Sequence, residues 1–206
     1  MPVDNKSFKM EDKNFGILTS IDWNSNKWKA LPTADDLQNS KFGYVEENNI
    51  THTYLNFGHT DFASDDDGYF YGLLPQFWSK TPQSKNIRVI FIKSQNWRDK
   101  KIYIVGLYLY PIFERKLLAS EIPGATTREV NIKALPKDIH LLENFMEVTS
   151  INKKKILPKG KNLGTQGFNY LTYENVLKVF DEMTLSNPND TKLNGIKFRF
   201  LKDLKS

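Results

Sequence analysis

The sequence of 206 residues contains no cysteine and only three histidines, His52, His59 and His140. Without cysteine, the chain can form neither a disulfide bond nor a thiolate metal site, and the histidines do not have a metal-ligand spacing such as HExxH. No apolar run approaches the ~18 residues that a membrane-spanning helix needs. The polar N-terminal segment also lacks the apolar centre of a signal peptide. We therefore expect a cytoplasmic protein with no membrane partner, no bound metal and no cofactor.

Sequence motifs of enzymes are also scarce. No GxSxG, P-loop or GxGxxG pattern occurs. His59, Asp61 and Asp65–Asp67 lie close together in "NFGHTDFASDDD" and have ligand types that suit a divalent metal. However, Asp and Gly runs are typical of solvated turns, and the predicted strands at 86–93 and 102–110 contain no acidic residue for a restriction-type nuclease. We expect a protein that is not an enzyme, with a metal-dependent hydrolase or nuclease using the His59–Asp67 cluster as an alternative.

Positive charge is concentrated in the second part of the chain. The net charge is +5, but residues 1–82 contain 12 acidic and 7 basic side chains, whereas residues 83–206 contain 12 acidic and 22 basic ones. A basic region indicates binding to a polyanion such as nucleic acid, although a solvated lysine-rich surface would have the same composition.

Apolar patterning predicts the first half of the fold. A strand is expected over 15–21, followed by a short helix with Thr33 at its N-cap and Asp36 completing a capping box. Residues 41–58 read as two strands joined by a turn at Asn48-Asn49, and 86–111 as a hairpin of two buried strands.

The second half is expected to mix both element types. Gly106 inside a strand indicates a bulge, "REVNIKALP" indicates another strand, and the apolar spacing over 138–148 predicts a helix. Residues 152–167 read as a basic loop, and Thr172 caps a helix over 172–183. We expect a disordered tail at 1–13 and one α+β domain at 14–206, built as a small mixed β-barrel or curved sheet of about six strands flanked by helices.

Aromatic residues are the most informative feature. They make up 13% of the chain, and "DGYFYGLLPQFW" alone contains five. The tryptophans, which lie in or beside predicted loops, are Trp23, Trp28, Trp78 and Trp97. Tyr69 and Tyr71 share one side of a predicted strand while Phe70 points to the core. Aromatic rings in loops or on the solvent side of a strand can bind a nucleobase, since base–aromatic stacking contributes ~1–3 kcal/mol per base.

Basic residues in loops are candidate phosphate contacts. The glycine-rich segment "NKKKILPKGKNLGTQG" precedes a helix N-terminus, where backbone N–H groups favour an anion, although a mobile surface loop is the simpler interpretation. The candidate phosphate-binding residues are Lys153, Lys154, Lys155, Lys159, Lys161, Arg98 and Lys100.

Several of these segments resemble the PUA-like superfamily, particularly its EVE and YTH branches. The order "FGILTSI", tryptophan-bearing loop, short helix, "KFGYV" is similar to the opening of that group. The hairpin containing Val105-Gly106 and the helix "TYENVLKVFDEM" are similar to its later part. The resemblance covers about two-thirds of the chain. Residues 56–82 do not fit the family pattern.

The resemblance implies one aromatic-lined pocket that reads nucleic acid. YTH domains enclose a methylated adenine, and EVE-like domains occur as specificity modules of McrBC-type restriction systems that recognise modified DNA bases. It implies a base-binding cage of Trp23, Trp78 and Trp97, with Asp22 and Asn24 at the base edge. Tyr69 and Tyr71 are further base-binding candidates from their shared side of the predicted strand.

The expected function is therefore a non-catalytic module of a restriction or defence system that flips a modified base into an aromatic cage. We expect DNA rather than RNA as the partner, together with further domains or subunits of a restriction complex. The alternatives are a PUA-like RNA-binding domain without modification specificity, the hydrolase above, and a protein-interaction or small-ligand module.

Overall fold

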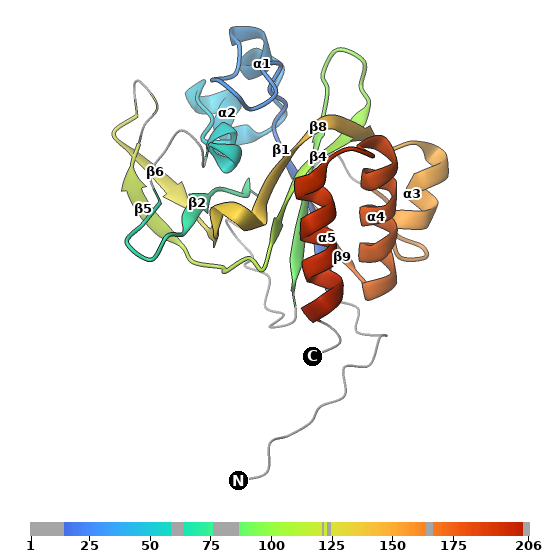
Figure 1. Ribbon diagram of the computed structural model, residues 1–206. Helices are drawn as coiled ribbons and strands as arrows, with labels where there is room; N and C mark the ends of the chain where they lie inside the picture. Colours follow the sequence, from blue (N-terminus) through green and yellow to red (C-terminus); the bar gives the residue numbers. More distant parts are fainter. Residues whose placement is uncertain are drawn as a thin grey trace.

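The computed structural model describes residues 15–58, 64–75, 87–120, 122, 125–163 and 167–203. Its centre is a five-stranded mixed sheet with the order β8-β4-β3-β1-β9 (Figure 1). Strand β1 is parallel to β3, and the other neighbouring pairs are antiparallel. The strands are β1 (Gly16–Ile21), β3 (Val89–Gln95), β4 (Ile102–Leu109), β8 (Ile139–Glu147) and β9 (Phe168–Leu171).

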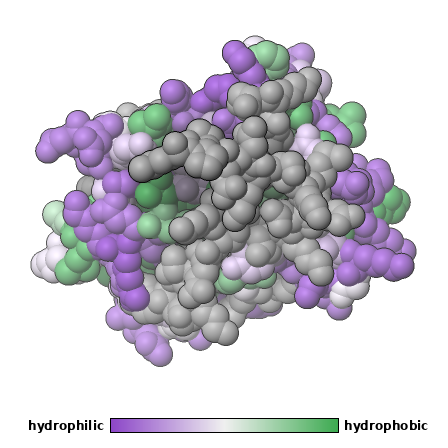
Figure 2. Space-filling model, turned by 90° about the horizontal axis from the view of Figure 1, so that it is seen from below, coloured by the Kyte–Doolittle hydropathy of each residue, from purple (hydrophilic) through white to green (hydrophobic). Residues whose placement is uncertain are grey.

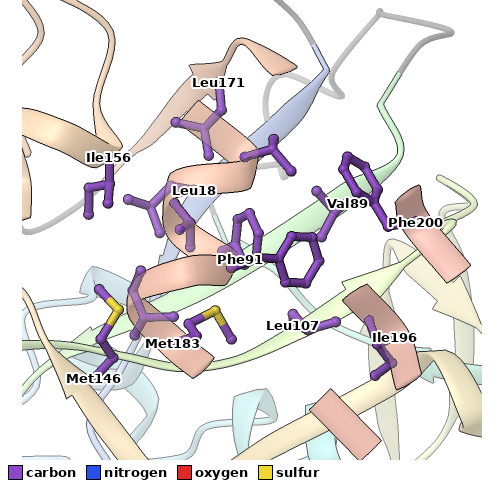
Figure 3. Packing of buried hydrophobic residues seen from close by; sticks show 14 of the residues in the cluster. Leu18, Val89, Phe91, Leu107, Met146, Ile156, Leu171, Met183, Ile196 and Phe200 are labelled. Carbon is purple, nitrogen blue, oxygen red and sulfur yellow. The ribbon is translucent and has the colours of Figure 1, made fainter. Parts of the chain in front are cut away.

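Three helices cover one face of this sheet (Figure 1). They are α3 (Ser150–Ile156), α4 (Tyr173–Ser186) and α5 (Thr191–Asp203). Phe91 of β3 packs edge-on against Phe180 of α4 with 5.1 Å between the ring centroids, and Phe200 of α5 joins the same cluster (Figure 3). Burial of these rings between sheet and helices supplies the main driving force for this half of the fold.

Smaller elements cover the other face. They are α1 (Ala34–Gln38), α2 (Gly43–Asn48), the 3₁₀ helices η1 (Thr53–Phe57) and η3 (Pro136–Asp138), and the two-stranded ribbons formed by β2 (Phe70–Gly72) with β7 (Ile132–Ala134) and β5 (Lys116–Ala119) with β6 (Thr127–Val130). A second core packs here, and Ile17, Ile90 and Tyr108 contribute to it from the sheet. The central sheet is therefore buried on both sides.

Several sequence-based predictions are confirmed. The first strand, the 86–111 hairpin and the helix after Thr172 all form. The Thr33–Asp36 capping box is present, and the Thr172 hydroxyl accepts a hydrogen bond from the Asn175 amide. The α+β class is also confirmed, but the described strands form an open sheet and two ribbons rather than a closed barrel.

Two predicted segments are wrong. Residues 41–58 form α2 and η1 instead of two strands, because Asn49 adopts the left-handed conformation (φ 52°) that ends a helix rather than forming a hairpin turn. Residues 139–147 form strand β8 instead of a helix. Leu142 and Met146 are four residues apart, so they face the same core in a strand, whose period is two, and the same spacing also fits one face of a helix.

Two further expectations concern loops and termini. The predicted basic loop at 152–167 begins as a helix, α3, in which Thr149 and Asn152 form a capping box. The predicted disordered tail at 1–13 lies outside the described residues. On the face seen from below, hydrophilic residues predominate among the coloured atoms, and hydrophobic residues form small separate patches (Figure 2).

Gly106 lies where strand β4 is irregular, and a substitution at this position tests the predicted bulge. A Cβ atom at this position would overlap the carbonyl oxygen of His140 and the ring of Phe57. We expect Gly106→Ala to lower the free energy of unfolding by about 1–3 kcal/mol, measured by urea denaturation, because the overlap forces the backbone apart. Gly195 is the matched control, since nothing lies within 4 Å of its added Cβ and Ala favours the helical state there. Equal stabilities of the two variants would contradict this account of the bulge.

Candidate functional site

The loop that follows β1 is held in place by one carboxylate. Asp36 accepts hydrogen bonds from the Ser25 amide (2.9 Å), the Ser25 hydroxyl (2.6 Å) and the Thr33 amide (3.0 Å). The indole N–H of Trp97 in the β3–β4 loop also donates to it at 2.8 Å. Burial alone would raise the pKa of Asp36, but the hydrogen bonds from Ser25 and Trp97 hold it below its usual value. Asp36 therefore joins three separate segments as an ionised anchor.

The same loop is strained. Lys27 and Trp28 both have φ of 54°, a conformation that costs free energy in residues other than glycine. The side chain of Asn24 supports it, donating to the carbonyl of Ala30 (2.9 Å) and accepting from the amide of Asn26 (2.8 Å). Asn24, predicted to read a base edge, is thus 1% exposed and engaged within its own loop.

Two of the predicted cage tryptophans do come together. Trp23 and Trp97 line one cleft, here called the Trp23 cleft, together with Asp36, Lys41 and Lys100. Its volume is only about 30 Å³, whereas a cavity of about 150 Å³ in another protein holds one benzene ring. The Trp23 cleft in this conformation therefore has no room for a base between the indoles.

Trp23 itself packs mainly into an aromatic cluster. Its ring centroid lies 5.7 Å from those of Trp28 and Tyr103 and 6.1 Å from that of Phe145, with edge-on or tilted geometry. Trp28 is only 2% exposed. The Arg98 guanidinium lies over the Trp97 ring, 4.8 Å from the ring centroid. Both candidate tryptophans stabilise the rim of the site as well as lining it.

A larger cavity adjoins the Trp23 cleft and shares Asp22 and Phe42 with it. It has a volume of about 180 Å³ and is called the Asp22 cavity. Its walls come from α2, from the loop to η1 and from the β5–β6 ribbon, and its lining residues include Phe42, Tyr44, Thr51, His52, Thr53, Leu117 and Glu129. The rings of Tyr44 and His52 lie 6.4 Å apart. This cavity is large enough for one aromatic ring.

Asp22 gives the cavity its chemical character. The carboxylate is 5% exposed and accepts hydrogen bonds from the hydroxyls of Thr51 (3.0 Å) and Thr53. Burial raises the pKa of Asp22 to about 6, although both hydroxyl hydrogen bonds act in the opposite direction. A buried carboxyl that titrates near neutral pH at the wall of a cavity is a feature that clusters at functional sites.

The other predicted base-binding residues lie elsewhere. Lys133 sits over the rings of Tyr69 (5.0 Å) and Tyr71 (5.3 Å) and forms an ion pair with Glu114. Tyr71 is buried, and Tyr69 lines a separate groove beside Tyr110. The structure does not bring these tyrosines to the Asp22 cavity. Trp78 lies outside the described residues.

The predicted phosphate-binding residues fall into two groups. Lys153, Lys154 and Lys155 lie on α3, where Lys155 pairs with Glu182 at 3.0 Å. Lys159 and Lys161 lie in the following loop and line a groove beside β9. Arg98 and Lys100 belong to the β3–β4 loop at the Trp23 cleft.

Sequence reasoning missed Phe42, Tyr44, His52 and the two threonines of the cavity. These residues lie in a segment that was assigned to strands, so their meeting with Asp22 could not be foreseen. The three consecutive polar side chains of "THT", Thr51 to Thr53, were the sequence signal that could have indicated a polar site here.

The alternative metal cluster receives no support from the described residues. Asp65 accepts hydrogen bonds from the amides of Asp67 (3.1 Å) and Tyr69 (2.7 Å), as in a polar turn. His59 and Asp61 lie outside the described residues, and within the described ones no group of three His, Asp or Glu side chains could hold a metal ion. No helix in the described ranges is long and apolar enough to cross a membrane.

No protein-family model, curated protein or solved structure matches this chain. The function is therefore inferred from the geometry of the site.

Asp22 predicts an unusual dependence of stability on pH. Its pKa is about 6 in the folded state and 3.8 without the fold, so the folded state binds the proton more tightly and stability falls as pH rises from about 4 to about 6. We expect Asp22→Asn to be more stable than the wild type at pH 7 by about 1–3 kcal/mol, since each pKa unit corresponds to ~1.4 kcal/mol. Chemical denaturation at pH 4, 5, 6 and 7 measures this, and the difference should shrink towards pH 4.

The exposed Asp66 provides the control for this experiment. Asp66→Asn should change stability little at any pH, because exposed surface substitutions usually stay within about 0.5 kcal/mol. A destabilised Asp22→Asn variant with no pH dependence would show that the carboxylate supports the fold.

Proposed function

We propose that this protein is a non-catalytic nucleic-acid-binding domain that encloses one nucleobase, flipped out of its stack, in the Asp22 cavity. The observation that carries the proposal is the combination of ring-sized volume, aromatic walls and a buried carboxylate in one cavity. We further propose a cytoplasmic, PUA-like module that reads a modified base for a modification-dependent restriction system, with DNA as its natural partner.

The shape of the cavity supports a flat heterocyclic ligand. Its volume of about 180 Å³ is slightly larger than a cavity that holds benzene. Phe42 and Tyr44 supply apolar faces, and Tyr44 is 48% exposed at the entrance. A flipped base gains its binding free energy from stacking on such rings and from hydrogen bonds to its edge.

The polar groups of the cavity support recognition of a base edge. Both threonine hydroxyls donate to Asp22, so the groups that remain for a ligand are chiefly acceptors. A buried polar site of this kind rejects ligands that leave its groups unpaired, which is the physical basis of strong discrimination between related rings.

Basic residues next to the cavity support a nucleic-acid ligand. Lys41 and Lys100 line the adjoining Trp23 cleft, and Arg98 lies on its tryptophan. In this proposal these side chains hold phosphates next to the inserted base and position the strand without reading its sequence.

The order of elements supports the proposed PUA-like fold. Strand β1, the helical pair α1 and α2, the hairpin β3–β4 and the late helix α4 follow one another as in the sequence resemblance. Because β1 and β3 are parallel, their C-terminal ends lie at the same edge of the sheet, and Asp22 follows β1 at this edge and lines the cavity.

A second candidate is a protein-interaction module that binds a cationic side chain. Asp22 and Glu129 both line the cavity beside aromatic rings, an arrangement that also suits a methylated lysine. Arg115 pairs with Glu129 and offsets one of these two charges, so we favour the nucleobase.

Binding of short oligonucleotides tests the main proposal. We would measure fluorescence anisotropy at fixed salt with labelled DNA and RNA carrying 5-methylcytosine, 5-hydroxymethylcytosine or N6-methyladenine, each beside its unmodified twin. The expected result is at least tenfold tighter binding of one modified DNA, a difference of ~1.4 kcal/mol. Equal binding of modified and unmodified strands would remove modification specificity, and tighter RNA binding would favour the RNA-binding alternative.

Tyr44→Ala should weaken that binding at least tenfold without unfolding the protein, because the removed ring lies at the cavity entrance and is half exposed. Phe198→Ala is the matched control, since Phe198 is 67% exposed on α5, away from the cavity lining. If neither variant changes the affinity, the base does not occupy this cavity. If wild type binds only trimethyllysine peptides, the second candidate is correct.

Asp22→Asn should combine a loss of binding with the gain in stability predicted above. The substitution keeps the shape but replaces a charged acceptor by an amide. Unchanged affinity at pH 7, measured in the same anisotropy assay, would show that Asp22 does not contact the ligand.

A further inference from the structure

We propose that a second groove, beside strand β9, binds unpaired nucleotides of the same strand whose base occupies the Asp22 cavity. This groove, called the Tyr170 groove, has a volume of about 500 Å³ and is lined by Lys159, Lys161, Phe168, Asn169, Tyr170 and Thr172. The proposal rests on the proposed function for the identity of the strand. It adds the prediction that the preferred target is single-stranded or locally melted.

The aromatic part of the groove is a pair of rings on one face of β9. Phe168 and Tyr170 are two residues apart, so their side chains point to the same side of the strand. Their ring centroids lie 5.3 Å apart with planes at 88°, so Phe168 supports Tyr170 edge-on. Both residues are half-buried. A half-exposed ring that is fixed by a neighbour is a platform on which one base can stack.

The charged part of the groove comes from a tight turn. The amide of Lys161 donates to the carbonyl of Pro158 (3.1 Å), and Gly160 between the two lysines has φ of 78°. Lys159 and Lys161 are both exposed, and no described acidic residue lines the groove. The side chain of Asn169 donates to the carbonyl of Asn162 (3.3 Å) and fastens this loop to β9. The lysines are thus held beside the rings, as binding of phosphates next to stacked bases requires.

Strand β1 connects the groove to the Asp22 cavity. Tyr170 pairs with Ile17, and Ile17 lies five residues before Asp22. At ~3.3 Å per residue, Tyr170 and Asp22 are separated by roughly 16 Å along β1. Trp23, Phe168 and Tyr170 also pack against the same core, on the sheet face opposite the helices α4 and α5. One strand can therefore occupy both sites within a few nucleotides.

The groove favours unpaired nucleotides over a duplex. Stacking on Tyr170 requires a base face that is free of its neighbour, which a regular duplex does not offer. The combination of a ring platform with cations, and few groups that could read a base edge, is typical of binding to single strands without sequence preference.

The test compares three ligands that carry the same modified base: a free nucleoside, a single-stranded 12-mer and the matching duplex. The variants are Tyr170→Ala, Tyr170→Leu, which keeps an apolar contact without a ring, and the double variant Lys159→Ala/Lys161→Ala. Phe198→Ala and Lys178→Ala are the controls, because both residues are exposed on helices and do not line the groove. Circular dichroism establishes that each variant is folded.

We expect both Tyr170 variants to weaken binding of the 12-mer about tenfold and to leave binding of the nucleoside unchanged. The double lysine variant should reduce the slope of log K against log salt by about 1.4, since each phosphate contact on a single strand contributes ~0.7. The controls should match the wild type, and the 12-mer should bind more tightly than the duplex.

Two outcomes would overturn the inference and remain distinguishable. If the Tyr170 and lysine variants bind the 12-mer like the wild type while the nucleoside or duplex still binds, the groove is not used and the proposed function stands. If the wild type binds none of the three ligands, the proposed function fails and the groove has no strand to receive.

Discussion

The parallel pairing of β1 with β3 is the constraint on which the rest of the structure depends. Parallel neighbours cannot be joined by a tight turn, so the chain must make a long crossover between Ile21 and Val89. That crossover contains α1, α2, η1 and β2, and therefore most of the walls of the Trp23 cleft and the Asp22 cavity. All six residues of β1 are buried, so the strand is fixed from both faces and its C-terminal end holds Asp22 in one position. The core thus determines where the site can form, and the crossover determines its chemistry.

Buried polar groups are concentrated at this end of the sheet. Lys93 of β3 is 1% exposed and donates to the hydroxyl of Ser20 in β1, and burial lowers the pKa of the lysine to about 8. Asp22 lies two residues after Ser20, just past the end of β1, and lines the cavity. Both ionisable groups have pKa values shifted towards neutrality because desolvation disfavours their charged forms. Each group keeps at least one hydrogen-bond partner, Ser20 for Lys93 and Thr51 for Asp22, which offsets part of the desolvation cost of its burial.

The sequence predicted the elements whose signals are local, and failed where tertiary structure decides. The capping box at Thr33, the cap at Thr172 and the β-rich hairpin were recognisable because each depends on residues that are close in sequence. Strand β8 was mistaken for a helix because Leu142 and Met146 are four residues apart, a spacing that puts two side chains on one side of either a helix or a strand. In the site, Asp22 and the proximity of Trp23 to Trp97 were predicted. The partners of Asp22 in the Asp22 cavity were not, since they come from a segment 20 to 31 residues away that was assigned to strands.

The aromatic residues, which dominated the sequence, divide into two groups by their surroundings. Trp28 and Tyr71 are buried in packing or covered by cations, and Trp97 is tied by its indole to Asp36. Tyr44 and Tyr170 were not singled out from the sequence, yet each has a partly exposed ring that lines a cavity or groove. A tryptophan buries more area and gains more by anchoring a loop, whereas a tyrosine at a rim can keep one face for a ligand. Aromatic content therefore indicated that rings matter in this protein, but accessibility, which only the fold determines, decides which of them are open to a ligand.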